Sequence, residues 1–416
     1  MKKQLPFVLF LFALFFIACD TSEEDGEYAE YLVARPIVMS RADFANSVDI
    51  LPPKPIDESG KVYAYEDYIF INDKSRGVHV INNSNPQQPV KVAFIEIPGN
   101  VDISVKDNYL YADSIMDLIV LDISDIQNIE QVNRLENVLR EGVFFPFEAE
   151  IVEYGTYDYE TEILIGWETV TERRLIEEVQ GRNIDFLGDI AVAESSDGGT
   201  TGQGGSLARF KIVGEYLYAV DTHTINVFDI SDLQNPQDLE DVYAGFDIET
   251  IFNRGEHLFL GSMRGMYIYD ISSPATPTFV SEFQHGTACD PVVVDGDYAY
   301  VTLRGGNGCG ALESGLFIVD ISTIQKPELT ISYPMDEPYG LGIRNEKLFV
   351  CDGSSGLKVY DKTNVEDISL LNHFKDIVTF DVIPLENHLI MVGDEILYQY
   401  EYLDDNIRLI SQIGLN

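Results

Sequence analysis

Four aspartates follow an apolar residue or a cysteine at similar places in the chain: Asp102, Asp247, Asp290 and Asp381. Carboxylate oxygens are the ligands that hard cations such as Ca²⁺ prefer, and carboxyl groups can also serve as general acids. If the four side chains met in space, they could therefore bind Ca²⁺ or supply acids to an enzyme. Each could instead accept hydrogen bonds from the backbone N–H groups of its own turn. The turn interpretation is favoured. Whether the four side chains meet depends on the fold that positions them.

The four cysteines indicate different roles. Cys289 and Cys309 flank a glycine-rich stretch and are expected to form a disulfide, which would contribute about 3 kcal/mol by closing a short loop. These two cysteines are a poor candidate for a metal site, because no second Cys/His pair is nearby. Cys351 lies in an apolar run and is expected to be a buried thiol. Cys19 belongs to the leader described below.

A segment rich in tyrosine, isoleucine and glutamate is a second candidate site. Its aromatic residues could anchor a protein or sugar partner, or they could pack the segment onto the rest of the molecule, which is the favoured interpretation. These residues are Tyr154, Tyr157, Tyr159 and Trp167. The sequence has no Gly-x-Ser-x-Gly, phosphate-loop or His-Glu-x-x-His motif, so the catalytic residues of any enzyme activity are unknown.

The first 18 residues are expected to be an export signal, with two lysines followed by an apolar run too short to span a membrane. Phe16-Ile17-Ala18-Cys19 resembles the lipobox of bacterial lipoproteins, which implies that Cys19 carries lipid; an ordinary cleaved signal is the alternative. The acidic run 20–25 resembles a surface-export signal of one Gram-negative phylum. This implies a chain anchored to the outer membrane and displayed at the cell surface, or alternatively facing the periplasm, with residues 19–35 as an acidic tether.

The chain is strongly acidic, with a formal net charge of −43. Nucleic-acid binding requires basic stripes that displace counterions, so a nucleic-acid partner is excluded. An acidic surface favours solubility and would suit cations or basic partners.

A short segment recurs along the chain in the form Gly, apolar, any residue, Val or Ile, apolar, Asp. Its seven copies, the last degraded, end at residues 82, 122, 229, 270, 320, 361 and 401. Most neighbouring copies are about 40 residues apart, and a turn-flanked hairpin pattern precedes most of them. A turn and a fourth apolar run follow. Four short strands per unit predict an all-β fold: a seven-bladed β-propeller over residues 61–416, with residues 36–60 as a lead-in that packs on the ring.

The segments Leu118–Ser124 and Leu316–Ser322 resemble the strand after which the LVIVD-repeat family is named. The resemblance covers residues 61–416 and implies a β-propeller that is secreted or displayed, without implying an activity. In this family the first strand of each blade lines the central channel. The resemblance therefore implies that four aspartates would lie at one channel mouth: Asp102, Asp247, Asp290 and Asp381. The aspartate that ends each repeated segment is expected to build its turn instead. These turn residues are Asp122, Asp229, Asp270 and Asp320.

An insertion over residues 140–206 separates the second and third repeats. Residues 162–167 read as a strand, and residues 195–206, rich in Ser, Gly and Thr, as a flexible linker. The insertion could be an outer hairpin, a cap over the ring or an eighth blade. Short helices are expected only over residues 40–48 and 171–179.

These features favour a membrane-anchored, non-catalytic binding scaffold for a protein or glycan partner. Two alternatives stay open: an extracellular enzyme with acidic residues at the channel mouth, and a structural component of the cell envelope.

Overall fold

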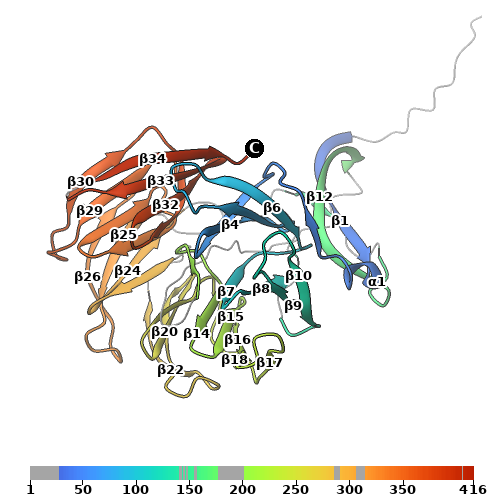
Figure 1. Ribbon diagram of the computed structural model, residues 1–416, viewed down its shortest axis with the longest axis horizontal. Helices are drawn as coiled ribbons and strands as arrows, with labels where there is room; N and C mark the ends of the chain where they lie inside the picture. The colour runs from blue at the N-terminus through green and yellow to red at the C-terminus, as the bar shows by residue number, and fades with distance from the viewer. Residues whose placement is uncertain are drawn as a thin grey trace, which may run out of the picture.

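The computed structural model describes residues 28–416 except 140–142, 144–145, 147–148, 154–156, 177–200, 285–290, 306–313 and 405. Within these ranges the chain is almost entirely β-strand, and the strands form eight sheets (Figure 1). Among the described residues, the short helix α1 (Arg41–Phe44) lies within the first of the two ranges where a helix was expected, and Ile176, which is also helical, lies within the second. The expectation of an all-β fold is confirmed.

Seven of these sheets share one pattern, in which consecutive strands pair as antiparallel neighbours. The first sheet contains β3 (Ser59–Tyr65), β4 (Tyr68–Asp73), β5 (Gly77–Asn82) and β6 (Val90–Glu96). The second contains β7 (Ile103–Lys106), β8 (Tyr109–Ser114), β9 (Asp117–Asp122) and β10 (Glu130–Leu135). The third contains β14 (Phe210–Val213), β15 (Tyr216–Val220) and β16 (Thr224–Asp229), with β17 (Gln237–Asp238) and β18 (Val242–Tyr243) both paired to β16.

The remaining four sheets of this pattern follow in chain order. The fourth contains β19 (Phe252–Arg254), β20 (His257–Ser262), β21 (Gly265–Asp270) and β22 (Thr278–Gln284). The fifth contains β23 (Val292–Asp295), β24 (Tyr298–Leu303), β25 (Gly315–Asp320) and β26 (Glu328–Pro334). The sixth contains β27 (Leu341–Arg344), β28 (Lys347–Cys351), β29 (Leu357–Asp361) and β30 (Ser369–Phe374). The seventh contains β31 (Thr379–Pro384), β32 (His388–Gly393), β33 (Ile396–Tyr402) and β34 (Ile407–Gly414).

The first strand of each sheet contacts the first strands of its two neighbours. The contacts run from β3 to β7, β14, β19, β23, β27 and β31 in turn, and β31 contacts β3 again. The sheets are therefore arranged in a propeller-like manner around a common axis, with their first strands innermost (Figure 1).

The aspartates that end the third strands build their turns as expected. In each case a carboxylate oxygen accepts a hydrogen bond of 2.8–2.9 Å from the backbone N–H two residues further on. These residues are Asp122, Asp229, Asp270, Asp320 and Asp361. Hydrogen bonds to the ionised carboxylate lower the pKa of Asp229, chiefly the bond from the Ser231 N–H.

The first and seventh sheets meet at a seam that joins the two ends of the ring. Ile69 and Ile390 pack there in one apolar cluster with Leu415, which is fully buried. The carbonyl oxygen of Leu415 accepts a 2.8 Å hydrogen bond from the backbone N–H of Ile56. Two further strands extend the first sheet: β2 (Asp49–Leu51) pairs with β6, and β13 (Gln203–Gly204) pairs with β3. The seam thus combines apolar packing with backbone hydrogen bonds, although no strand is shared across it.

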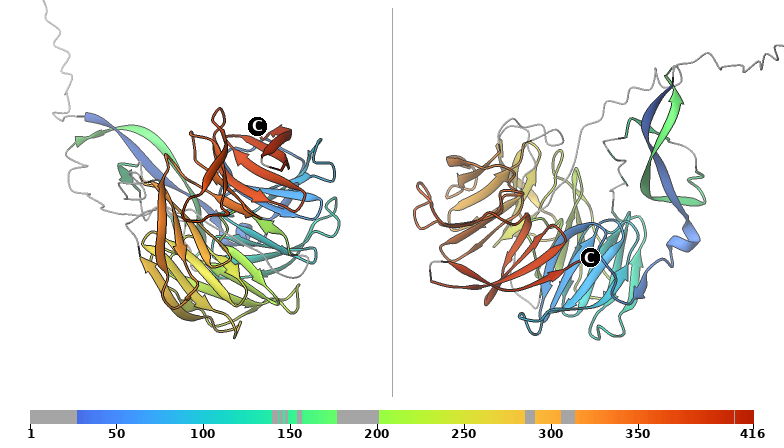
Figure 2. Two further views of the ribbon diagram at one scale, coloured as in Figure 1. Left: turned by 90° about the vertical axis from the view of Figure 1, so that its left-hand side faces the viewer. Right: turned by 90° about the horizontal axis from the view of Figure 1, so that it is seen from above.

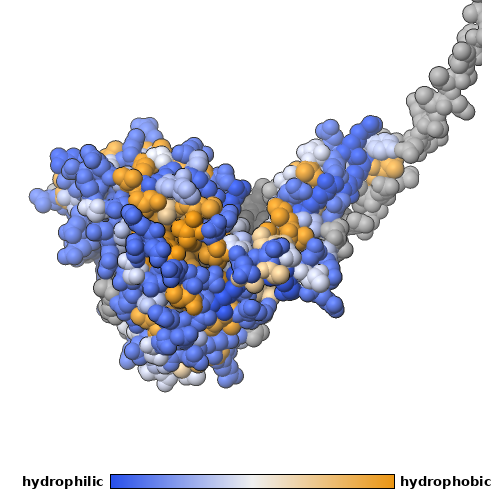
Figure 3. Space-filling view, turned by 45° about the vertical axis from the view of Figure 1, so that its right-hand side comes forward, coloured by the Kyte–Doolittle hydropathy of each residue, from blue (hydrophilic) through white to orange (hydrophobic). Residues whose placement is uncertain are grey.

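The eighth sheet stands beside the ring and is called the arm sheet below (Figure 2). It contains β1 (Tyr28–Ser40), β11 (Ile151–Val152) and β12 (Glu162–Leu175), with β1 in the middle. Phe44, Ile115 and Ile163 form a small apolar cluster that joins its base to the second sheet. In the view of Figure 3, apolar residues gather on the ring next to the arm sheet, and hydrophilic residues cover most of the remaining surface.

The arm sheet differs from the expected organisation in two respects. Residues 28–35, expected in a tether, form the start of β1, and residues 171–175, expected in a helix, belong to β12. Pairing with the whole length of β1 satisfies the backbone of this second segment and outweighs its helical pattern. The strand expected over residues 162–167 is confirmed. In the described part of the insertion, β11 and β12 therefore pair with the N-terminal strand β1, β13 pairs with β3, and no further four-stranded sheet is formed.

Candidate functional site

One position of each sheet faces the centre of the ring, four residues before the end of the first strand in six sheets and three before it in the seventh. The strand register places seven residues at this position: Lys61, Asp102, Arg209, Thr250, Pro291, Gly340 and Asp381. Asp102 and Asp381 are thus equivalent, whereas Asp247 stands three residues before Thr250. The four aspartates therefore do not share one position, and Asp290 lies outside the described residues.

The ionisable residues at this position alternate between acidic and basic from sheet to sheet. Lys61 of the first sheet lies between Asp381 of the seventh and Asp102 of the second, and Arg209 of the third follows Asp102. Asp102, Arg209 and Asp381 are buried, and the side chain of Lys61 is 11% exposed with its Nζ atom buried. Nζ of Lys61 lies 3.4 Å from Oδ2 of Asp102. Burial, together with the nearby Arg209 guanidinium, lowers the pKa of Lys61 to about 8.

Residues 201–209, called the channel segment below, occupy the centre of the ring. Thr201 bridges to Lys106, and β13 pairs with β3. The N–H of Gly205 donates to the carbonyl oxygen of Val62 (2.8 Å), and the N–H of Ile251 donates to that of Ala208 (3.2 Å). The channel segment thus contacts the first, second and fourth sheets before it enters β14.

The side chain and backbone of Ser206 join the channel segment to the sixth and seventh sheets. The N–H of Ser206 donates to Oδ1 of Asp381 at 2.9 Å, and the N–H of Leu341 donates to Oγ of Ser206 at 2.5 Å. Asp102 closes the segment at its other end, where its Oδ2 accepts hydrogen bonds from the backbone N–H groups of Arg209 and Phe210. The two equivalent aspartates therefore bind the chain itself.

The expectation of a flexible linker over residues 195–206 differs from the structure in its described part. Residues 204–209 are buried and hydrogen-bonded. A Cβ at Gly205 would lie 1.7 Å from Oδ2 of Asp381, and one at Gly202 would lie 2.1 Å from the Tyr63 ring. Glycine is present here because no side chain fits between the segment and the inner strands, so its role is close approach.

The two aspartates combine the turn role with a new one. Oδ1 of Asp102 accepts from its neighbour Ile103, and Oδ1 of Asp381 accepts from Val382, as the turn interpretation requires. Oδ2 of Asp381 is buried and has no hydrogen-bond partner among the described residues. Because this burial penalises the charged carboxylate, the pKa of Asp381 is raised to about 8. The carboxyl group is therefore mostly protonated and uncharged below about pH 8, so its burial away from water does not leave an unpaired charge.

The described residues contain no group of three or more His, Cys, Asp or Glu side chains placed to hold a metal ion. The carboxylate of Asp247 pairs with Arg264 at 3.2 Å. The Ca²⁺ site considered at the channel mouth therefore has no support from Asp102, Asp247 or Asp381, and its fourth proposed ligand is not described.

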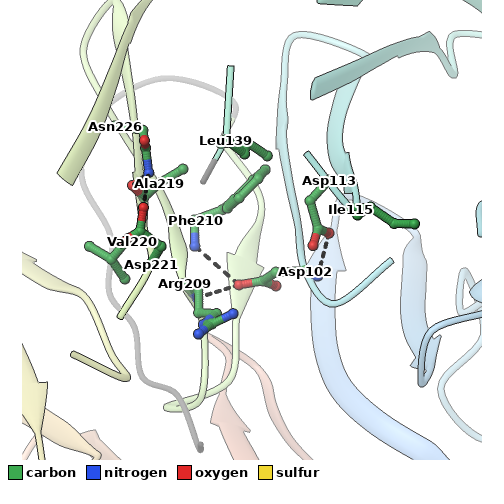
Figure 4. Close-up of a pocket in the computed structure, with 10 residues that line it drawn as sticks. All are labelled: Asp102, Asp113, Ile115, Leu139, Arg209, Phe210, Ala219, Val220, Asp221 and Asn226. Carbon is green, nitrogen blue, oxygen red and sulfur yellow. Dashed lines mark hydrogen bonds between the residues drawn. The ribbon is translucent and has the colours of Figure 1, made fainter. Parts of the chain in front are cut away.

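A small cavity lies beside the channel segment, between the second and third sheets (Figure 4). Its polar lining includes Asp102, Asp113, Arg209, Asp221 and Asn226. Its volume of about 10 Å³ holds one water molecule and no larger ligand. Oδ1 of Asn226 is buried without a partner among the described residues, which makes this atom the natural acceptor for such a water. Burial raises the pKa of Asp113 to about 6.

Three of the candidate aromatic anchors lie within the described residues. The rings of Tyr157 and Tyr159 lie 4.6 Å apart at the tip of the loop before β12, where Tyr159 is 61% exposed. The indole N–H of Trp167 donates to the carbonyl oxygen of Val143. Tyr154 lies outside the described residues, as do Cys19, Cys289 and Cys309. Cys351 is a free, fully buried thiol as expected, and its pKa is raised well above the usual value by burial.

Lys61, Arg209 and the channel segment were not among the site residues predicted from the sequence. Lys61 and Arg209 occupy the repeat position that holds aspartate in the second and seventh sheets, so counting back from each hairpin would have found them. The channel segment carried no comparable signal, because glycine-rich composition predicts flexibility and close packing equally well.

Comparison with known proteins supports the repeat architecture. The chain carries LVIVD repeats over residues 58–93, 99–132, 204–242, 254–284 and 285–334. No curated protein matches the chain. Among the described residues, no helix is long and apolar enough to cross a membrane.

Solved structures resemble the chain in fold alone. A protein from Bacteroides fragilis, provisionally described as a 6-phosphogluconolactonase, is 8% identical with a TM-score of 0.53; the match covers 87% of this chain and 97% of that one. A functionally unknown protein from Desulfotomaculum acetoxidans is 10% identical with a TM-score of 0.51, covering 85% and 95%. A protein from Lactobacillus plantarum is 12% identical with a TM-score of 0.51, covering 77% and 85%. Identities this low transfer no activity.

Proposed function

We propose that this protein is a lipid-anchored, surface-displayed binding scaffold whose ring presents its outer faces to a protein or glycan partner. The observation that carries this proposal is the filled channel. An enzyme built on such a ring would gather its acids from several sheets at the centre, where a substrate could reach them. Here the central carboxylates of Asp102 and Asp381 are buried against residues 201–209. The surfaces left for recognition are the faces of the ring and the arm sheet.

The proposal includes a ring of seven blades. Its support is the unbroken path of contacts from β3 through the first strands of the other sheets and back from β31 to β3. The seventh sheet, whose repeat segment is degraded in sequence, still contains four paired strands. A closed ring leaves no exposed sheet face and offers a rigid frame for loops.

The proposal also includes an anchor at Cys19 in the outer membrane. Its support is the leader sequence and the acidic run after it. The described chain begins at Tyr28 in the arm sheet, at the end far from α1, so the anchor would join the molecule there (Figure 2). Metabolic labelling with an alkyne-tagged fatty acid would test this. The intact protein should be labelled, and the Cys19→Ala variant should not; an unlabelled wild-type protein would refute the anchor.

A binding experiment would separate a scaffold from an enzyme. Fluorescent protein covering residues 27–416 would be titrated onto outer-membrane vesicles and extracted polysaccharide of its own species. A scaffold should bind saturably, and mass spectrometry should find the bound material chemically unchanged after hours. Accumulating products would favour the enzyme alternative, and binding that never saturates would overturn the proposal.

A further inference from the structure

Exposed aromatic residues gather on the ring where the third and fourth sheets meet. Phe246 is 51% exposed and Tyr243 is 62% exposed. His223 lies on one side of Phe246, and Asp247 and Arg264 lie on another. These five residues, called the Phe246 platform below, come from three separate segments: the turn before β16, the end of β18 with the connection to β19, and the turn between β20 and β21.

The ring of Phe246 is held in place although half of it is exposed. Its centroid lies 5.5 Å from that of His223 and 6.0 Å from that of Tyr243, and both pairs meet edge to face. Below it, a Cβ at Gly245 would lie 2.9 Å from the Tyr267 ring, so the loop is packed tightly onto the fourth sheet. A fixed aromatic surface costs little conformational entropy when it binds.

Polar groups border the aromatic surface. Asp247 has a left-handed backbone conformation with φ of 54°, and its carboxylate accepts a hydrogen bond of 3.2 Å from Nε of Arg264. Strained residues of this kind are concentrated at binding sites. The Arg264 guanidinium carbon lies 5.4 Å from the Phe246 ring centroid, and the Arg264 side chain is 62% exposed. A carboxylate and a guanidinium therefore offer acceptors and donors beside the aromatic surface, with the guanidinium over one face of the Phe246 ring.

This combination matches a neutral sugar ring. One face of a hexose presents C–H groups, which attract the negative face of an aromatic ring, while its hydroxyl groups both donate and accept hydrogen bonds. The ion pair of Asp247 and Arg264 leaves the platform without net charge, and the whole chain carries −43. An anionic polymer would be repelled by that field, whereas a neutral one is unaffected.

We infer that the Phe246 platform binds a sugar unit of a neutral oligosaccharide or polysaccharide, with Phe246 stacking on the sugar and Asp247 and Arg264 bonding its hydroxyl groups. This inference rests on the proposed function and gives its partner a chemical class and a place on the ring.

Isothermal titration with neutral hexasaccharides tests the inference on the protein covering residues 27–416. The probes are maltohexaose, cellohexaose and laminarihexaose, with hexagalacturonate as the anionic comparison. At least one neutral probe should bind, with a dissociation constant in the micromolar to millimolar range, and hexagalacturonate should bind at least tenfold more weakly. The inference is overturned if no neutral probe binds or if the anionic probe binds as well.

Variants locate the site. Phe246→Ala should weaken binding about tenfold or more, Phe246→Tyr should keep it, and Arg264→Gln should weaken it by a smaller factor. The matched control is Phe279→Ala, because Phe279 is 56% exposed on β22 and lies outside the platform. Equal affinity of Phe246→Ala and wild type, with unchanged melting temperatures, would overturn the platform.

The failure of this inference differs from the failure of the proposed function. Wild-type protein that binds the cell-envelope material but none of the hexasaccharides would refute the platform alone. Protein that binds neither would refute both.

Discussion

The backbone N–H of Ser206 donates a 2.9 Å hydrogen bond to Oδ1 of Asp381, across 175 positions of the chain. This bond joins the end of the insertion to the last sheet of the ring. It also explains why the centre of the ring is closed, because the same carboxyl group lies against Gly205 and Gly340, where added Cβ atoms would clash with it. A change that disturbs the packing of the channel segment should therefore also destabilise the ring, and the reverse should hold as well.

Gly205→Ala should destabilise the protein by about 1–3 kcal/mol, the usual cost of forcing a methyl group into a packed site. The new Cβ would lie 1.7 Å from Oδ2 of Asp381, so the channel segment must shift. Urea unfolding measures the change. Gly414→Ala is the control, because nothing lies within 4 Å of a Cβ there. Equal stability of the two variants would show that the channel segment is not packed as described.

Asp381→Asn should change how stability depends on pH. The pKa of Asp381 is raised from 3.8 to about 8 in the folded state. Between these values the folded protein holds a proton that the unfolded chain has lost, so the free energy of unfolding falls as pH rises, by up to about 1.4 kcal/mol per pH unit. The amide does not titrate, so the variant should lose this slope between pH 6 and 8. Parallel curves for variant and wild type would contradict the assignment.

Lys61→Met should destabilise the protein by about 3–5 kcal/mol, because it removes the ammonium group that lies 3.4 Å from the buried carboxylate of Asp102. Nζ of Lys61 is buried, whereas Lys74 pairs with Glu58 at 2.5 Å on the exposed surface. Lys74→Met should therefore cost less than about 1 kcal/mol. Chemical denaturation of both variants at pH 7 gives the comparison. Similar small effects at the two sites would mean that Lys61 does not neutralise the centre of the ring.

Deletion of Leu415 and Asn416 should open the seam between the first and seventh sheets. Leu415 is fully buried and its carbonyl oxygen accepts the N–H of Ile56, whereas Asn416 is exposed. Loss of a buried leucine costs about 2–5 kcal/mol. Thermal unfolding should show a lower midpoint for the two-residue deletion and almost no change when Asn416 alone is removed. Two equal midpoints would argue against the seam.

Thiol counting tests the expected disulfide. Protein covering residues 27–416 contains Cys289, Cys309 and Cys351. Ellman's reagent should label none of them in the folded protein, because Cys351 is buried and its pKa is raised. It should label one after unfolding, and three after unfolding with reductant followed by removal of the reductant. Three labelled thiols without reductant would exclude the Cys289–Cys309 bond.

The sequence predicted the sheets well because each repeat carries its own local signals. Asp270 marks the end of one strand, and its turn forms from contacts within a few residues. The centre of the ring was harder to predict because its contacts join distant segments. Asp102 and Asp247 look alike in sequence, yet only the strand register shows that Thr250, and not Asp247, faces the channel. The arm sheet was not predicted for the same reason. In the sequence, β1 precedes the strands of the first two sheets and β12 follows them.

The pairing of β1 with β12 has a mechanical consequence. All 13 residues of β1 pair with β12, from Tyr28 opposite Leu175 to Ser40 opposite Glu162, with one β-bulge between Ile37 and Val38. A pull on the chain before Tyr28 acts along the strand, and the hydrogen bonds of an antiparallel pair lie perpendicular to it. The tension would therefore run along the backbone of β1 to α1 and the first sheet, and the bonds to β12 would hold β1 extended under that load. Drag on the ring, in flowing liquid or from a bound polymer, would meet a chain that is already straight, with little slack to draw out before the first sheet.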